Sequence, residues 1–297
     1  MKRKALFKNP VNYGYFFILP AVIFMLFMIG YPIVYNLLIS VQDVTNMTLA
    51  KSHRDFVGFE NFMNIFHDPS FLRSVKQTLI YTVGCLVIQF SIGFLMAIFF
   101  SKEFRCSKTV RSLIVISWML PMTVTALIWK FMLSEVGIIN FVLLKMHLIS
   151  EPITWLINGN SAMWGLILAN SWVGIPFNML LLTTGLNNIS PEIYEAASID
   201  GTNPVQKFFY LTVPMLKNTI MSVLVLGFVY TFKVFDLVFV MTGGGPVDAT
   251  EVISTYSYKR SFKFYNFGEG AAAATVLSVI LLIIALFYLK SVNNEEQ

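Results

Sequence analysis

Charged side chains are scarce in this 297-residue chain, in which only 12% of the residues are Asp, Glu, Lys or Arg and 56% are hydrophobic. The mean hydropathy is +0.69. A soluble core of this size cannot hide so much apolar surface. The lack of charge therefore excludes an ordinary soluble protein and predicts an integral membrane protein.

Residues that carry metal or redox chemistry are also few. The two cysteines are Cys85, inside an apolar run, and Cys106, in a short polar loop, so we expect no disulfide. His53, His67 and His147 have no partner at metal-ligand spacing, which argues against a metal site. No cluster of ionisable residues suited to a membrane-embedded enzyme is found, and an enzyme or enzyme scaffold stays a weaker alternative.

Motifs for nucleotides and nucleic acids are missing as well. No glycine is followed by lysine, so the phosphate-binding loop of nucleotide hydrolases is absent. The net charge of +5 comes without a basic stripe interleaved with aromatics outside the membrane, which argues against nucleic acid as a partner. We therefore expect no cofactor on this chain, and any ATP and Mg²⁺ that drive it must bind to another chain.

Long apolar runs are what the sequence has in abundance. A span needs about 20 mostly apolar residues to cross ~30 Å of hydrocarbon, and the first run is too long for a cleaved signal peptide. We predict a single all-α membrane domain over residues 1–297, in which each long apolar run, from the first to the last, forms a transmembrane helix. The six predicted spans are residues 13–41, 76–100, 112–133, 162–186, 216–241 and 270–289.

Lysine and arginine predict the orientation, because cytoplasmic loops are enriched in both. Four precede the first span and four lie between the second and third, which places both segments in the cytoplasm. Six spans then put both termini, and residues 187–214, on the cytoplasmic side of the cell membrane. The residues that decide this are Lys2, Arg3, Lys4, Lys8, Lys102, Arg105, Lys108 and Arg111.

The polar segment 187–214 carries the signals of two short helices. Ser190 can cap a helix that starts at Pro191, and Gly201 permits the left-handed backbone that ends it. Asn203 and Gln206 then form a capping box around Pro204, and Pro214 breaks or restarts the second helix. The pattern predicts a helical hairpin, which from the residues alone is either a docking element or an amphipathic pair resting on the lipid headgroups.

The same hairpin carries a family resemblance. Glu195-Ala196-Ala197, then Gly201 after three residues and Leu211-Thr212-Val213-Pro214 after nine more, resembles the E-A-A-x3-G-x9-I-x-L-P motif of ABC importer permeases. Leucine and valine replace the family's isoleucine and leucine. The string from Tyr194 to Gly201 and the segments 56–62 and 242–246 are similar to the carbohydrate branch, which imports maltose-type oligosaccharides, glycerol phosphate and related sugars.

The resemblance implies a type I ABC importer permease with six transmembrane helices, whose hairpin is the coupling helix that docks on a cytoplasmic ATPase. It implies as partners a second related permease, two ATPase subunits, an extracytoplasmic sugar-binding protein, a carbohydrate and the membrane lipids. A stand-alone secondary carrier is the other alternative, although it typically shows repeated halves and ionisable relays. The expected coupling residues are Tyr194, Glu195, Ala196, Ala197, Asp200, Gly201 and Pro214.

Aromatic residues of the third span are the first candidates for a substrate pathway. Trp118, Met122, Thr125 and Trp129 have offsets of 0, 4, 7 and 11, which lie on one face of a continuous helix. Aromatic faces suit the apolar faces of sugar rings. The alternative is that Trp129 belongs to the interfacial aromatic belt and Trp118 packs against another helix.

Polar residues of the fourth and fifth spans are the other candidates. Asn170 and Asn178, with Gly174 between them, form a polar seam that either joins helices or lines a wet pathway. Lys233 and Asp236 are three residues apart and can pair, or can snorkel to the outer interface. With Tyr230, these residues complete the candidate pathway.

Overall fold

The computed structural model describes residues 10–51, 54–102 and 104–293, which form helices and no strand within those ranges. Lys2, Arg3, Lys4, Lys8 and His53 lie outside the described residues. The chain folds as two compact units, one of residues 1–65 and 257–275 and the other of residues 66–256 and 276–297.

Membrane-length helices dominate the described chain. Four are long and apolar enough to cross a membrane, namely Phe17–Ser40, Pro69–Phe100, Gly159–Asn187 and Phe267–Lys290. Two further pairs of bent helices pass the same test together. If each bent pair is one span, the number of spans is six, the number that the sequence predicts, although the second pair begins at Pro204 within the predicted hairpin.

The first unit begins with an apolar helical run of three segments, α1 (Pro10–Met25), the π-helical turn η1 (Leu26–Gly30) and α2 (Tyr31–Ser40). In the most apolar 18-residue stretch between Phe17 and Ser40, no side chain is buried inside the protein. A helix that is apolar all round suits a lipid or protein environment rather than water. Neither Pro20 nor Pro32 interrupts the helical run.

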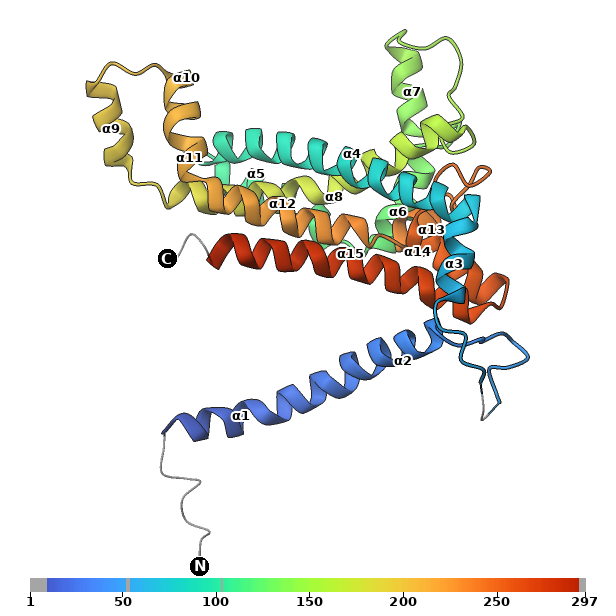
Figure 1. The fold of residues 1–297 in the computed structure, drawn as a ribbon. Coiled ribbons are helices and arrows are strands. Elements are labelled where there is room, and N and C mark those ends of the chain that lie inside the picture. The colour runs from blue at the N-terminus through green and yellow to red at the C-terminus, as the bar shows by residue number, and fades with distance from the viewer. Residues whose placement is uncertain (1–9, 52–53, 103, 294–297) are drawn as a thin grey trace, which may run out of the picture. The chain divides into compact units, whose positions relative to one another are not determined.

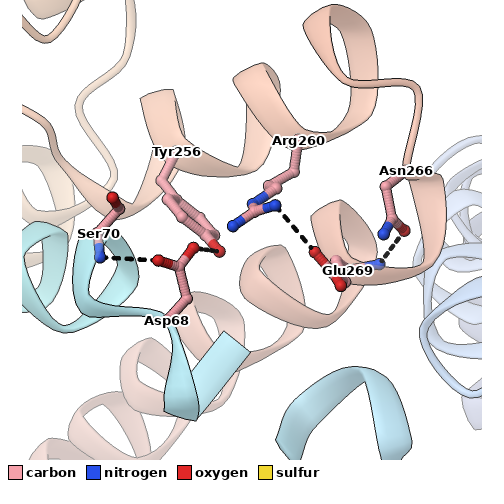
Figure 2. Close-up of polar contacts among 6 residues, drawn as sticks. All are labelled: Asp68, Ser70, Tyr256, Arg260, Asn266 and Glu269. Carbon is pink, nitrogen blue, oxygen red and sulfur yellow. Dashed lines mark hydrogen bonds and ion pairs between the residues drawn. The ribbon is translucent and has the colours of Figure 1, made fainter. Parts of the chain in front are cut away.

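Polar contacts hold the rest of the first unit together. Asn36 of α2 donates to Thr275 Oγ1 at 3.0 Å and to the carbonyl of Ala271 at 3.3 Å. Arg260 pairs with Glu269 at 3.3 Å (Figure 2). The backbone of Glu269 donates to Asn266 Oδ1. The remaining helical segments that reach this unit are α3 (Glu60–His67), η3 (Lys259–Lys263) and the start of α15 (Phe267–Asn293).

The second unit is a helical bundle around α4 (Pro69–Phe100) and α8 (Gly159–Asn187). Asp68 caps α4 by accepting from Ser70 N at 2.9 Å, and it also accepts from the Tyr256 hydroxyl at 2.7 Å (Figure 2). The other helices of this unit include α5 (Ser107–Met119), α6 (Met122–Met132), α7 (Ile138–Lys145), α12 (Lys217–Phe232), α13 (Asp236–Met241) and α14 (Ile253–Tyr258).

Glycine brings α4 and α8 into close contact. A Cβ on Gly93 of α4 would lie 2.6 Å from Asn178 Cβ, and one on Gly174 of α8 would lie 2.2 Å from Gln89 Cδ. Such small residues let helix backbones approach closely in a membrane. The α4/α8 pair is therefore the packed centre of this unit.

The long helices of the second unit separate two functional ends. The hairpin of residues 187–214, with helices α9 (Pro191–Ile199) and α10 (Pro204–Lys207), extends from one end, and α7 lies at the other (Figure 1). The basic turn 101–108 lies at the hairpin end, where it lines a cavity together with Pro191 and Glu195. The basic turn and the hairpin, which the sequence predicts to lie on the same side of the membrane, thus share one end of the bundle.

The third predicted span is not one straight helix. Helices α5 and α6 meet at Leu120-Pro121 with a bend of 98°. Proline lacks an N–H and pushes the preceding residue toward an extended backbone, and Leu120 has φ −71° and ψ 139°. The predicted common face of Trp118, Met122, Thr125 and Trp129 is therefore wrong, because Trp118 belongs to α5 and the other three to α6.

The fifth predicted span is also segmented. After α10 come the π-helical turn η2 (Phe208–Thr212) and α11 (Val213–Met215), and these meet α12 with a bend of 68°. The break falls at Leu216, two residues beyond Pro214. At the far end, α12 stops at Phe232 and α13 starts at Asp236, so residues 216–241 are not continuously helical.

Candidate functional site

The first helix of the hairpin is defined by local capping. The Ser190 side chain accepts from Glu192 N at 3.4 Å, and Pro191 occupies the first helical position. The helix ends where Gly201 adopts a φ of +77°, a left-handed conformation that costs glycine little. Nothing lies within 4 Å of a Cβ built on Gly201, so only the backbone requires glycine there.

The second helix begins with the predicted capping box. Asn203 N donates to Gln206 Oε1 at 2.9 Å, and Gln206 N donates to Asn203 Oδ1 at 2.8 Å. In the π-helical turn that follows, Val213 N donates to the Phe208 carbonyl. Single π turns inside α-helices are frequent at functional sites.

Side chains fasten the two hairpin helices to each other. The hydroxyls of Tyr194 and Thr212 are 3.0 Å apart and hydrogen-bonded. One turn further along, Lys207 Nζ donates to Ser198 Oγ, and that hydroxyl donates to the Tyr194 carbonyl. Phe208 packs on Phe94 of α4 with ring centroids 5.5 Å apart. The hairpin is therefore braced internally and attached to the bundle.

Most of the predicted coupling residues are accessible. Glu195, Ala196, Asp200, Gly201 and Pro214 are exposed, whereas Tyr194 is half-buried and Ala197 is buried. Large apolar side chains on the same hairpin also face outward, notably Ile199, Val205, Phe209 and Tyr210. An apolar patch rimmed by polar groups marks a protein or membrane interaction surface.

A second candidate site is a cavity of about 310 Å³ in the middle of the second unit. Helices α4, α5, α8 and α12 supply most of its walls, and Met122 at the start of α6 also lines it. Three of the eight predicted pathway residues line it, namely Trp118, Asn170 and Tyr230. The other lining residues are Gln89, Leu120, Met122, Val173, Gly174, Phe177, Gly227 and Thr231.

Aromatic rings form one wall of this cavity. Phe177 lies between Trp118, at 5.5 Å between ring centroids, and Tyr230, at 6.0 Å with an edge-on geometry. Trp118 is 46% exposed and Tyr230 60% exposed, so this wall is open on one side. The rings offer flat apolar surfaces, and the indole N–H and the phenol hydroxyl add polar edges.

Amides form the opposite, buried part of the cavity. Gln89 and Asn170 are 4% and 7% exposed, and Gln89 Nε2 donates to the Asn170 carbonyl at 3.3 Å. The Gln89 side chain lies directly over Gly174, where no Cβ obstructs it. A few polar groups converging in a mostly apolar pocket are typical of small-molecule sites.

Three predicted pathway residues, two of them buried and Trp129 half-buried, pack against other parts of the protein. Thr125 is fully buried, and the Trp129 ring packs edge-on against Trp172 with centroids 6.3 Å apart. Asn178 is 2% exposed and donates to the Gly174 carbonyl of its own helix at 2.8 Å. None of the three lines the cavity. Their assignment to a substrate pathway stays a prediction, and their contacts fit a role in helix packing better.

The charged pair of the fifth span lies outside the cavity. Lys233 and Asp236 are both exposed, and no ion pair joins them in the part of the chain that the structure describes. Lys233 Nζ instead lies over the Tyr230 ring at 5.4 Å from its centroid. Such a cation–π contact contributes roughly 0.5–1 kcal/mol at an exposed site. Lys233 therefore borders the cavity through Tyr230.

Several residues of the cavity and of the hairpin are not predicted from the sequence as site residues. Gln89 and Phe177 line the cavity, and Ser198, Lys207 and Thr212 brace the hairpin. A lone amide in the middle of an apolar span is a signal that could have identified Gln89. Phe177 and Thr212 have no such signal, because their partners come from other segments.

Comparisons with known proteins agree with this geometry. Residues 89–294 match the family described as binding-protein-dependent transport system inner membrane component. A probable ABC transporter permease protein of Bacillus subtilis is 31% identical over 93% of this chain and 94% of its own. The trehalose/maltose transport system permease protein of Thermococcus litoralis is 30% identical over 93% and 92%.

A solved structure agrees with the fold. In the crystal structure of a bacterial ABC transporter involved in the import of the acidic polysaccharide alginate, one chain superposes with a TM-score of 0.79. It is 22% identical and covers 94% of each chain. The family that the hairpin motif resembles is thus confirmed. The chain belongs to the binding-protein-dependent transport system inner membrane component family, the membrane-spanning permeases of ABC transporters.

Proposed function

We propose that this permease imports a carbohydrate and that the cavity between α4, α5, α8 and α12 contacts it. The aromatic wall next to two buried amides carries this proposal. Sugars present apolar ring faces together with hydroxyls, which match stacked rings and amide groups. The similarity to a trehalose/maltose permease supports the same substrate class.

The hairpin of residues 187–214 is the coupling element in this proposal. Its outward apolar side chains and exposed Glu195 and Ala196 suit docking on a cytoplasmic ATPase, which binds and hydrolyses the ATP with Mg²⁺. The braces from α9 to α10 and to η2 support a rigid lever, because they hold the two arms of the hairpin together. Two ATPase subunits and a second, related permease complete the assembly.

The orientation follows from the two ends of the second unit. The hairpin and the basic turn 101–108 face the cytoplasm, together with both termini. The end that carries α7 faces outward and receives sugar from a binding protein. Closure of the ATPase moves the hairpins, and through them the helices expose the cavity first to the outside and then to the cytoplasm. Binding of the sugar in turn favours ATPase closure, because the coupling free energy between two sites is reciprocal.

The function is tested by assembly and uptake. The full chain is purified under gentle detergent with its neighbouring-gene products and reconstituted into vesicles. We expect an ATPase and a second permease to co-purify, and ATP-dependent uptake of one member of a radiolabelled set of mono- and oligosaccharides. Uptake driven by a proton or sodium gradient without an ATPase would support a secondary carrier and contradict the proposal.

A further inference from the structure

We propose that the cytoplasmic end of α5 binds an anionic phospholipid, with the phosphate in a basic cavity and an acyl chain in an adjoining apolar groove. The proposal extends beyond sugar transport and rests on the proposed cytoplasmic orientation. Two separate cavities on one helix carry it, and they differ in chemistry in the way that the two parts of a lipid do.

The first cavity has a volume of about 720 Å³ and lies between the end of α4, the start of α5 and the hairpin. Lys102, Lys108 and Arg111 line it, and among the lining residues that the structure describes Glu195 is the only acidic one. None of the three cations makes an ion pair within the described part of the chain. The cavity therefore holds an excess of positive charge that no carboxylate of these residues neutralises.

The second cavity is an apolar groove of about 500 Å³ between α4, α5 and α8. On α5 it is lined by Leu113, Ile114, Ile116 and Ser117. The one hydroxyl among them is internally bonded, since Ser117 Oγ donates to the carbonyls of Ile114 and Trp172. The α5 wall of the groove thus offers hydrocarbon surface without a polar side chain in need of a partner.

The spacing of the two cavities along α5 matches the distance between the phosphate and the acyl chains of a phospholipid. Ser107, Arg111 and Ile114 are spaced by four and three residues, so they lie on one face of α5. Arg111 and Ser117 are about 9 Å apart along the helix axis, at 1.5 Å per residue. A headgroup phosphate bound at Arg111 would place the start of its acyl chains beside the groove.

Charge complementarity selects an anionic lipid. Clusters of Lys and Arg immediately cytoplasmic of a membrane helix, and basic pockets between such helices, recognise anionic headgroups. A zwitterionic lipid gains less from this cavity, because its cation would lie beside Lys102 and Lys108. A lipid here would also contact Pro191 and Glu195 of the hairpin, so it is positioned to stabilise the coupling element.

The test measures lipid retention by native mass spectrometry. The full chain with its partner subunits is delipidated and then incubated with an equimolar mixture of phosphatidylglycerol and phosphatidylcholine. We expect the wild type to retain phosphatidylglycerol. Each cation contributes about fivefold near an anionic headgroup, so Arg111→Gln should weaken retention about fivefold and Arg111→Gln with Lys108→Gln about 30-fold.

Matched variants separate the alternatives. Lys145→Gln removes an exposed cation at the α7 end and should leave retention unchanged. Ile116→Trp fills the groove from a half-exposed position and should also lower retention. Lys102→Gln, at the exposed turn, repeats the charge test if the Arg111 variant does not assemble. Sugar uptake is measured separately, so a failure of the proposed transport function is distinguishable.

Three results would overturn the proposal. One is equal retention of both lipids by the wild type. Another is displacement of phosphatidylglycerol by inorganic phosphate with no effect of Ile116→Trp, which would identify a free anion as the ligand. The third is loss of the ATPase from the Arg111→Gln complex with lipid retention unchanged, which would assign the cations to ATPase docking.

Discussion

The hairpin and the cavity are built in opposite ways. The hairpin is a run of consecutive residues whose caps, turn and braces connect positions at most 18 residues apart, as between Tyr194 and Thr212. The cavity collects side chains from five helices, and its lining extends from Gln89 to Thr231. A local element is specified by backbone preference, whereas a distributed site is specified by packing between helices.

This difference predicts different kinds of failure. Damage to the cavity should act through helix packing and ligand contacts, and damage to the hairpin through backbone conformation. The four changes below test that division, from the largest expected effect to the smallest.

Gly174→Ala should have the largest effect, because its Cβ would lie 2.2 Å from Gln89 Cδ. Forcing an extra methyl into packed structure costs about 1–3 kcal/mol. We expect the free energy of unfolding in mixed detergent to fall by that amount. Gly174→Ala combined with Gln89→Ala should recover part of the loss, because the second change removes the obstructing amide. An unchanged stability of the single variant would show that the Gln89 amide turns aside into the cavity, and it would contradict a fixed contact between Gln89 and Gly174.

Gly201→Val should impair the hairpin through its backbone alone. A non-glycine residue in the left-handed region costs roughly 1–2 kcal/mol, and this glycine has a φ of +77° and no neighbour within 4 Å of its Cβ. We expect uptake and transport-linked ATP hydrolysis to fall about 5- to 30-fold, with membrane insertion intact. Gly201→Asn is the matched control, because Asn tolerates this conformation. Normal transport by the valine variant would contradict the hypothesis that the turn at Gly201 is needed for coupling.

Trp118→Ala should weaken sugar binding without disturbing the hairpin. Aromatic contacts are worth about 0.5–1.5 kcal/mol beyond their buried area, so the half-saturation concentration for uptake should rise about 2- to 12-fold. Phe131→Ala is the control, since Phe131 is 70% exposed on α6 and does not line the cavity. An equal effect of both variants would mean that general aromatic anchoring, and not the cavity, explains the result.

Tyr194→Phe should have the smallest effect. It removes the hydrogen bond to Thr212 and keeps the ring, and one such bond contributes about 1 kcal/mol or less to stability. We expect transport-linked ATP hydrolysis to fall about two- to fivefold, with basal ATP hydrolysis unchanged. Tyr210→Phe, at a residue 77% exposed on the same hairpin, should change neither rate.

Local rules predict the hairpin well. Ser190 and Gly201 act as the sequence indicates, and Asn203 with Gln206 forms both bonds of the capping box. All of these depend on neighbours within a few positions, where amino-acid preference is strongest. The brace from Tyr194 to Thr212 does not, because a π-helical turn rotates Thr212 away from the place that a regular helix would give it.

Tertiary packing limits prediction of the cavity. Pro121 indicates a kink, but its 98° size depends on the helices around it. That bend separates Trp118, which reaches the cavity, from Thr125, which is fully buried, and Trp129, which is half-buried against Trp172. Asn170 and Tyr230 can be identified from the sequence as cavity candidates, because polar side chains are rare inside apolar spans. Phe177, the ring between Trp118 and Tyr230, looks like any other apolar residue in a span.

The open aromatic wall has a consequence for how such importers acquire new ligands. Trp118 and Tyr230 leave about half of their surface free, so this chain provides an incomplete binding contour. In the proposed assembly, a neighbouring subunit closes the contour. Ligand range is then a property of the pairing, and replacing the neighbour with a duplicated, diverged copy would retune selectivity with no substitution in this chain.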